Sequence, residues 1–253
     1  MVIPQAKTIL LTTLLFFTFL SAASAEGNVH PDLTKKAEHI KRISLLPPQI
    51  DMFEISAGGS LEKMEDWSQP ARTHMRKSIK EEFAKREHLQ LTEFDEQAIS
   101  STARTTYNQT LLLYDAVLSA IMTHTFQSSY QRSALFFPWK ARDFAYSVGK
   151  EIDVFAPNVD AYVLIRGFDQ RSSVGRKALG VGTAIVGAAV GVVIIPQRGA
   201  NLFTASLIDA HTGDILWFSK SLAPYDLRKP EEATKLVLEF MSELPSLGHP
   251  PSK

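Results

Sequence analysis

Acidic residues around one histidine are the side chains of this sequence that could support catalysis. Asp209 and Asp214 stand on either side of His211, and a carboxylate beside an imidazole is a pair that general acid–base chemistry uses. The intervening residues 210–213 (Ala-His-Thr-Gly) are also typical of a β-hairpin turn, where Asp and Gly occur for conformational reasons alone. We therefore assign both aspartates to the turn and predict no catalytic residues.

Histidines and glycines could also bind a metal or a nucleotide. The seven histidines are scattered, and no two stand at the i, i+4 spacing that places two metal ligands on one helix face. The chain contains no cysteine, which excludes thiolate ligands and disulfides. Gly180-x-Gly182 lacks the third glycine of a dinucleotide loop, and no Gly-Lys-Ser/Thr sequence is present. We predict neither a metal nor a cofactor.

Three arginines are candidates for binding an anion or a partner protein. Arg166, Arg171 and Arg176 follow one another at intervals of five residues, near the end of a predicted strand. Guanidinium groups pair well with carboxylates and phosphates. The alternative is that all three lie on a solvated sheet edge and bind nothing.

Residues 178–196 form an apolar insertion rich in glycine and alanine and free of charge. Its length just reaches that of a membrane-spanning helix. Small residues four positions apart also favour close helix packing. We predict membrane contact or self-association, and the alternative is a glycine-rich excursion or a buried strand pair within the domain. The glycines concerned are Gly180, Gly182, Gly187 and Gly191.

Residues 1–25 are predicted to be a secretory signal peptide. A basic Lys7 precedes the apolar stretch 8–20, and Ala23-Ser24-Ala25 supplies small residues at the two positions that a signal peptidase reads. An uncleaved membrane anchor is the alternative, although the apolar stretch is short for one. Without a cysteine there is no lipid attachment site, so we expect a periplasmic or outer-membrane-associated protein.

The composition is that of a globular protein without an electrostatic preference for nucleic acid. The 253 residues include 27 basic and 27 acidic side chains, and a balanced charge does not favour a nucleic-acid partner. We expect a polar tether at 26–42, a single α/β domain at 43–244 and a disordered tail at 245–253.

The apolar patterns predict an α+β or α/β domain, in which helices flank a mixed sheet of roughly five strands. Apolar positions four residues apart indicate helices, and short apolar or alternating runs indicate strands. The predicted strands are 43–46, 49–56, 89–94, 161–168, 202–209 and 214–219, and the predicted helices follow Trp67, cover 96–126 and 140–155, and begin at Pro230.

Several short motifs resemble those of bacterial envelope proteins related to the curli secretion component CsgG and the penicillin-binding-protein activator LpoB. They are Ile43–Pro48, Gly58-Gly59, Asp160–Leu164, Ser206–Asp209 and the hairpin Thr212–Trp217. The resemblance implies a protein-binding α/β domain without catalysis, used in secretion, assembly or cell-wall regulation. Most members of that group are lipoproteins, which this chain is not.

The preferred functional hypothesis is therefore a non-enzymatic, exported envelope accessory protein that binds another envelope protein or itself. A membrane-inserted oligomeric secretion or pore component is the nearest alternative, with membrane contact through residues 178–196. A hydrolase with a non-standard site is a third hypothesis, and it requires a deep polar pocket that holds a histidine beside a carboxylate.

Overall fold

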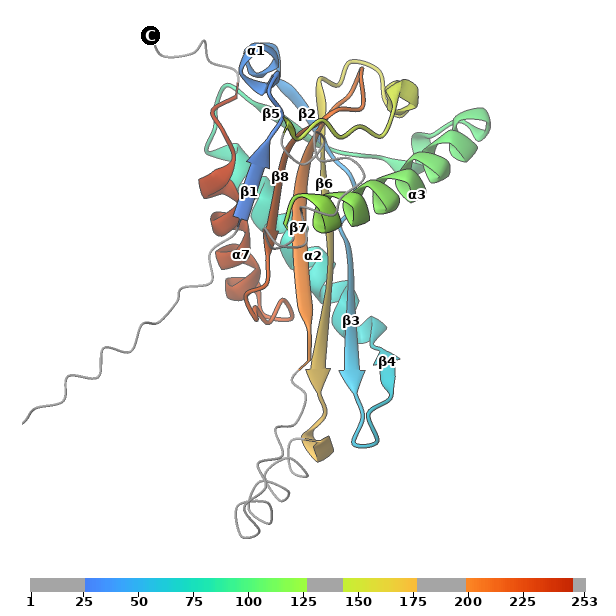
Figure 1. Ribbon diagram of the computed structural model, residues 1–253, viewed down its shortest axis with the longest axis vertical. Coiled ribbons are helices and arrows are strands. Elements are labelled where there is room, and N and C mark those ends of the chain that lie inside the picture. Colours follow the sequence, from blue (N-terminus) through green and yellow to red (C-terminus); the bar gives the residue numbers. More distant parts are fainter. Residues whose placement is uncertain (1–25, 127–142, 177–198, 248–253) are drawn as a thin grey trace, which may run out of the picture.

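The computed structural model describes residues 26–126, 143–176 and 199–247 (Figure 1). The predicted signal peptide and the four glycines of the apolar insertion lie outside the described residues. In chain order the elements are β1 (Glu26–Val29), α1 (Leu33–Ala37), β2 (Arg42–Leu45), β3 (Gln49–Ile55), β4 (Leu61–Lys63), α2 (Glu65–Ala84), β5 (Gln90–Glu93), the 3₁₀ turn η1 (Glu96–Ala98), α3 (Ser101–His124), the 3₁₀ turn η2 (Lys150–Val154), β6 (Ala161–Ser172), β7 (Asn201–Asp209), β8 (Ile215–Ser221) and α7 (Pro230–Glu243).

The fold is mixed α/β, with one open mixed sheet of eight strands in the order β1-β8-β7-β6-β2-β5. The long strand β6 pairs with β2 through its first residues and with β3 through its later ones, and β4 pairs with β3. The prediction of roughly five strands was too low. The strands that it missed, β1 and β4, are short edge strands whose pairing partners the sequence pattern does not reveal.

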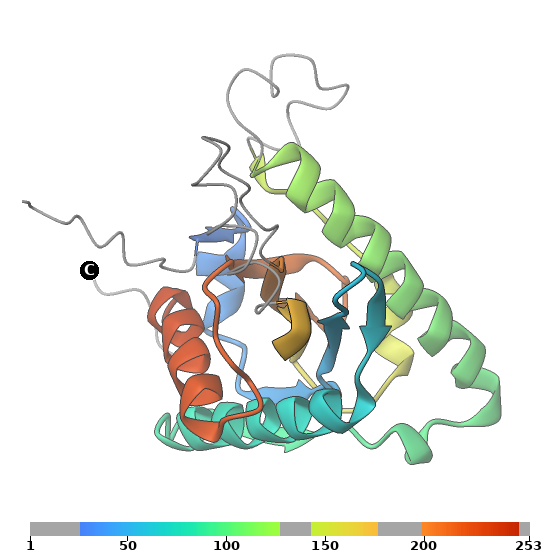
Figure 2. The same ribbon diagram turned by 90° about the horizontal axis from the view of Figure 1, so that it is seen from below.

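Helices cover both faces of the sheet, and each face has its own core. Along β6, Val163 and Ile165 pack with α2 and α7, whereas Tyr162 and Leu164 pack beneath α3. Alternate residues of a strand point to opposite faces, so this single strand contributes to both cores. Figure 2 shows α2 beside α7 on one side of the sheet and α3 crossing the other side.

Three of the four predicted helices are present as α2, α3 and α7, and the fourth is not. Ala71, Met75, Ile79 and Phe83 of α2 are all buried, and α7 begins at Pro230 as expected. α2 starts at Glu65, so Pro70 lies in its second turn. The expected helix 140–155 is wrong over its described part, because Gly149 has a φ of +84° and only the 3₁₀ turn η2 follows it. A left-handed backbone interrupts an α-helix.

The two ends of the domain extend further than predicted. Residues 26–42 are not a tether, because β1 pairs with β8 and α1 buries Leu33 and Ala37 in the core. At the other end, Leu247 is 1% exposed and packs in the same core, so the first residues of the expected tail belong to the domain. In the described ranges, no helix combines the length and apolar character needed to cross a membrane.

Candidate functional site

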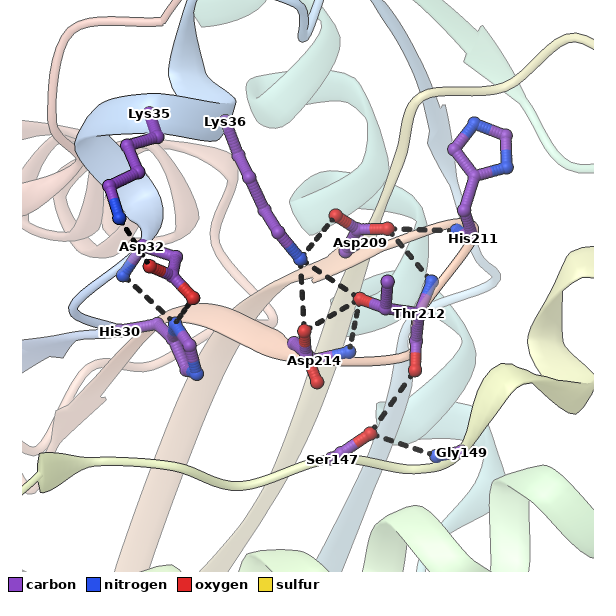
Figure 3. A network of polar contacts seen from close by, with 10 residues as sticks. All are labelled: His30, Asp32, Lys35, Lys36, Ser147, Gly149, Asp209, His211, Thr212 and Asp214. Atoms are coloured by element: carbon purple, nitrogen blue, oxygen red, sulfur yellow. Dashed lines mark hydrogen bonds and ion pairs between the residues drawn. The ribbon is translucent and has the colours of Figure 1, made fainter.

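The β7–β8 turn, which contains the predicted acid–base candidates, is held by a lysine from α1 (Figure 3). The ammonium of Lys36 lies 2.9 Å from Oδ2 of Asp209 and 2.9 Å from Oδ2 of Asp214, and it donates a 3.0 Å hydrogen bond to Thr212. The other carboxylate oxygen of Asp209 accepts hydrogen bonds from the backbone N–H groups of His211 and Thr212. Lys36 belongs to the segment that the sequence analysis treated as a tether, so this partner was missed.

Lys36 of α1 and the two aspartates of the turn, Asp209 and Asp214, remain ionised at neutral pH. Burial disfavours the charge of Lys36, but its hydrogen bonds to Asp214 and Asp209 outweigh burial and raise its pKa. Burial also opposes ionisation of Asp209 and Asp214, and hydrogen bonds from Lys36, Thr212 and the turn backbone outweigh it and lower both pKa values. A general acid or base needs a pKa near the working pH. The pKa values of Lys36, Asp209 and Asp214 are all shifted away from neutral pH, which does not suit that role. The effect of the network is to fasten α1 to the turn.

The histidine of the turn makes a separate contact on the surface. Nδ1 of His211 lies 2.9 Å from Oδ1 of Asp153 in η2, and these side chains are 65% and 62% exposed. The ring points away from the Lys36 cluster in Figure 3. An exposed pair of this kind does not meet the requirement of the hydrolase hypothesis for an enclosed histidine and carboxylate.

A polar groove of about 480 Å³ near the start of β2 also contains histidines and carboxylates. His39 and His88 line it together with Glu87, and both histidines are exposed. A ring nitrogen of His88 lies 2.8 Å from the carbonyl oxygen of Leu247. The described residues that line it include no serine, threonine or cysteine, so they offer no side-chain hydroxyl or thiol as a nucleophile.

The three candidate arginines do not form one site. Arg166 lies on the α3 face of β6, whereas Arg171 reaches the opposite face, where its Nε lies 2.6 Å from the buried Asp169 and its Nη2 donates to the carbonyl of Tyr225. An interval of five residues is odd, and an odd interval in a strand reverses the face. Arg176 lies beyond the end of β6, so the structure does not bring the three arginines together as one anion or partner contact.

Arg166 lines a groove of about 540 Å³ between α3 and the sheet, here called the α3 groove. Two cross-strand rows of side chains form its floor. β6 pairs in register with β3 and β7, so one row is Gln49-Arg166-Thr204 and the next is Asp51-Phe168-Leu202. One face of α3 forms the opposite wall. The residues of that wall are Asp115, Leu118, Ser119, Met122 and Thr123.

The guanidinium of Arg166 is enclosed and only partly satisfied. Its side chain is 9% exposed, Nε donates a 2.8 Å hydrogen bond to Oδ1 of Asp115, and its central carbon lies 5.4 Å from the ring centre of Tyr114. Nη1 and Nη2 are buried and have no hydrogen-bond partner among the described residues. Buried polar groups are usually paired, so two unpaired guanidinium nitrogens are an exception that calls for an explanation.

The remaining site predictions concern metals and the insertion. In the part of the chain that the structure describes, no group of three or more His, Asp or Glu side chains could hold a metal ion. Gly180, Gly182, Gly187 and Gly191 lie outside the described residues, between β6 and β7.

Comparison with known proteins identifies no family. No protein-family model and no curated protein matches the chain. Among solved structures, the chain of the PelC dodecamer from Paraburkholderia phytofirmans is similar at 9% identity and a TM-score of 0.34. The match covers 87% of this chain and 94% of that chain. At this TM-score we base no statement about fold or function on the likeness.

Proposed function

We propose that this protein is a non-enzymatic, exported envelope accessory protein that binds another envelope protein or a second copy of itself through one end of its sheet. We call this end the sheet tip and define it as the β3–β4 turn (56–60), Leu61 and residues 173–176. The single observation that carries the proposal is that this end presents two large apolar side chains, Val174 and Leu61, which are 83% and 54% exposed.

The sheet tip is an ordered part of the domain, built from segments far apart in the sequence. The backbone N–H of Ser173 donates a 3.0 Å hydrogen bond to the carbonyl of Ile55, which is paired across the hairpin with Leu61. A Cβ built at Gly175 would contact Ala57. Figure 1 shows β3, β6 and β7 running past α3 and α7 to this end of the molecule.

The position of the sheet tip in the chain adds a second argument. β6 and β7 are antiparallel neighbours paired from Ala161↔Asp209 to Asp169↔Asn201. In the sequence, the charge-free residues 178–196 stand between these two strands and follow closely after residues 173–176 of the sheet tip. Exposed apolar side chains beside an uncharged apolar segment indicate a contact with protein or lipid.

The test combines charge substitution at the sheet tip with a matched substitution elsewhere. We expect Leu61→Asp with Val174→Asp to convert oligomers or partner complexes of the exported protein into monomers by light scattering. Leu112 is 70% exposed and belongs to α3 rather than to the sheet tip, so Leu112→Asp is the control and should change nothing. A monomeric wild-type protein that captures no envelope partner, or oligomers unaffected by the double substitution, would contradict the proposal.

The alternative function is a membrane-inserted oligomeric component, and the uncharged residues 178–196 favour it. Fractionation of the exported protein beside a variant that lacks 178–195 separates the two functions. The accessory-protein proposal expects wild type and variant in the soluble fraction. Retention of wild type in membranes, with release of the deletion variant as a soluble monomer, would favour the membrane component.

A further inference from the structure

The α3 groove has the size and the mixed lining of a small-molecule site. Its volume of about 540 Å³ lies within the range of ligand pockets, which are mostly apolar with a few placed polar groups. Phe168 and Leu202 of the floor face Leu118 and Met122 of α3, and the polar row that contains Arg166 adjoins them. The groove is independent of the sheet tip.

Among the described charged side chains that line the groove, Arg166 has hydrogen-bond donors that no acceptor uses. Asp51 of β3 forms ion pairs with Lys63 at 2.9 Å and with Arg72 at 2.7 Å. Asp115 occupies only the Nε edge of Arg166, and its own side chain remains 51% exposed. Within the part of the chain that the structure describes, the two Nη groups of Arg166, each with two N–H donors, have no acceptor.

The unused donors form one of the edges of the guanidinium that can bind a carboxylate through two hydrogen bonds. Nη1 and Nη2 present parallel N–H groups to two oxygens, and such bidentate pairs are among the strong hydrogen bonds of proteins. Both nitrogens are shielded from solvent where they lie, so an acceptor has to reach them from the groove as the guanidinium turns toward it.

We propose that the α3 groove binds a small amphipathic carboxylate. Its carboxylate accepts hydrogen bonds from Nη1 and Nη2 of Arg166, and its apolar part lies on Phe168 and Leu202 beneath Leu118 and Met122. Binding satisfies the buried donors and covers the apolar floor in one step. The ligand is thus selected by its charge at one end and by its apolar surface at the other.

Calorimetric titration of the exported full chain with octanoate tests the proposal, with 1-octanol as the matched probe that lacks the carboxylate. We expect saturable octanoate binding and at least about tenfold weaker binding of octanol, which is the loss expected when hydrogen bonds to a charged group are removed. Arg166→Met should weaken octanoate to the level of octanol. Absence of octanoate binding, or equal binding of both probes, would overturn the proposal.

A second variant keeps the test decisive if Arg166→Met does not fold. Ser119 is exposed on α3 and lines the groove, so Ser119→Phe fills the groove without removing a core contact. We expect it to weaken octanoate binding at least about tenfold while the circular dichroism spectrum is unchanged. Gln109 is exposed on the same helix outside the groove, and Gln109→Phe should bind octanoate as wild type does. Equal weakening by both phenylalanines would place the effect outside the groove and overturn the proposal.

Discussion

The ammonium of Lys36 lies 2.9 Å from the carboxylate of Asp209, which joins the first helix of the domain to the turn of its last hairpin. Both side chains are largely buried, at 26% and 12% exposure, so solvent screens the pair only in part. The same ammonium holds Asp214. Removal of the lysine would leave two carboxylates close together without their cation.

Lys36→Met should lower the free energy of unfolding by about 1–3 kcal/mol, because it leaves partly buried charges unpaired. Urea unfolding at neutral pH measures the change. Lys35 is the matched control, since its side chain is 84% exposed and pairs with Asp32, the half-exposed N-cap residue of the same helix, at 3.5 Å. Lys35→Met should change stability by less than about 0.5 kcal/mol. Similar losses for the two variants would show that the network is not what fastens α1.

Stability should fall in acid, partly through Asp209. The fold lowers the pKa of this carboxyl below the value near 3.9 of an unfolded aspartate, so its contribution is present above about pH 4 and lost as pH falls through the folded pKa. Burial raises the pKa of Asp169, which acts in the opposite sense. Asp209→Asn should be less stable than wild type at pH 7, and urea unfolding at pH 3 should show a smaller difference between the two proteins. A difference that is the same at both pH values would contradict this assignment.

The buried hydroxyl pair beneath α3 should show strong coupling. The Tyr114 and Ser206 hydroxyls lie 2.8 Å apart in the core, and burial raises the pKa of Tyr114, so the phenol stays neutral. Tyr114→Phe leaves the Ser206 hydroxyl without this partner and should cost about 1–2 kcal/mol. The double variant with Ser206→Ala should cost less than the sum of the single ones. Additive losses in thermal unfolding would mean that the hydrogen bond contributes nothing.

Gly213 should tolerate no side chain. Its φ is +74°, and a Cβ built there would lie 2.1 Å from the carbonyl oxygen of Gly149. Gly213→Ala should therefore destabilise the protein by more than about 1 kcal/mol. Gly58 is the control, because a Cβ there meets only Ser56 Oγ at 3.9 Å. Gly58→Ala should leave the melting temperature nearly unchanged, and an equal shift for the two variants would show that the close approach is relaxed at little cost.

The predicted cleavage after Ala25 would leave β1 at the start of the mature chain. Mass spectrometry of the exported protein should give Glu26 as its first residue. A chain that begins at Pro31 lacks the pairing of β1 with β8, so it should melt at a lower temperature and aggregate through the uncovered strand edge. The half-exposed Val29 supplies a control, since Val29→Thr keeps the backbone pairing. A truncated chain as stable and monodisperse as the mature one would contradict a structural role for β1.

The sequence by itself determined the elements whose apolar pattern is strong. The four-residue spacing from Ala71 to Phe83 defined α2, the alternation and turn residues of 202–219 defined the last hairpin, and Pro230 marked the start of α7. These signals are local, because burial of one face of a helix or strand imposes its own period on the sequence. The same local reading assigned Asp209 and Asp214 to a turn.

Tertiary structure alone decided which distant segments meet. β1 and α1 are short and polar, and they are ordered through β8 and Lys36, which no local pattern reveals. The odd spacing of Arg166 and Arg171 already implied opposite faces, but only the pairing of β6 with β3 and β7 built the row Gln49-Arg166-Thr204. Strand register depends on partners far away in the chain, and for that reason the α3 groove could be found only in the folded protein.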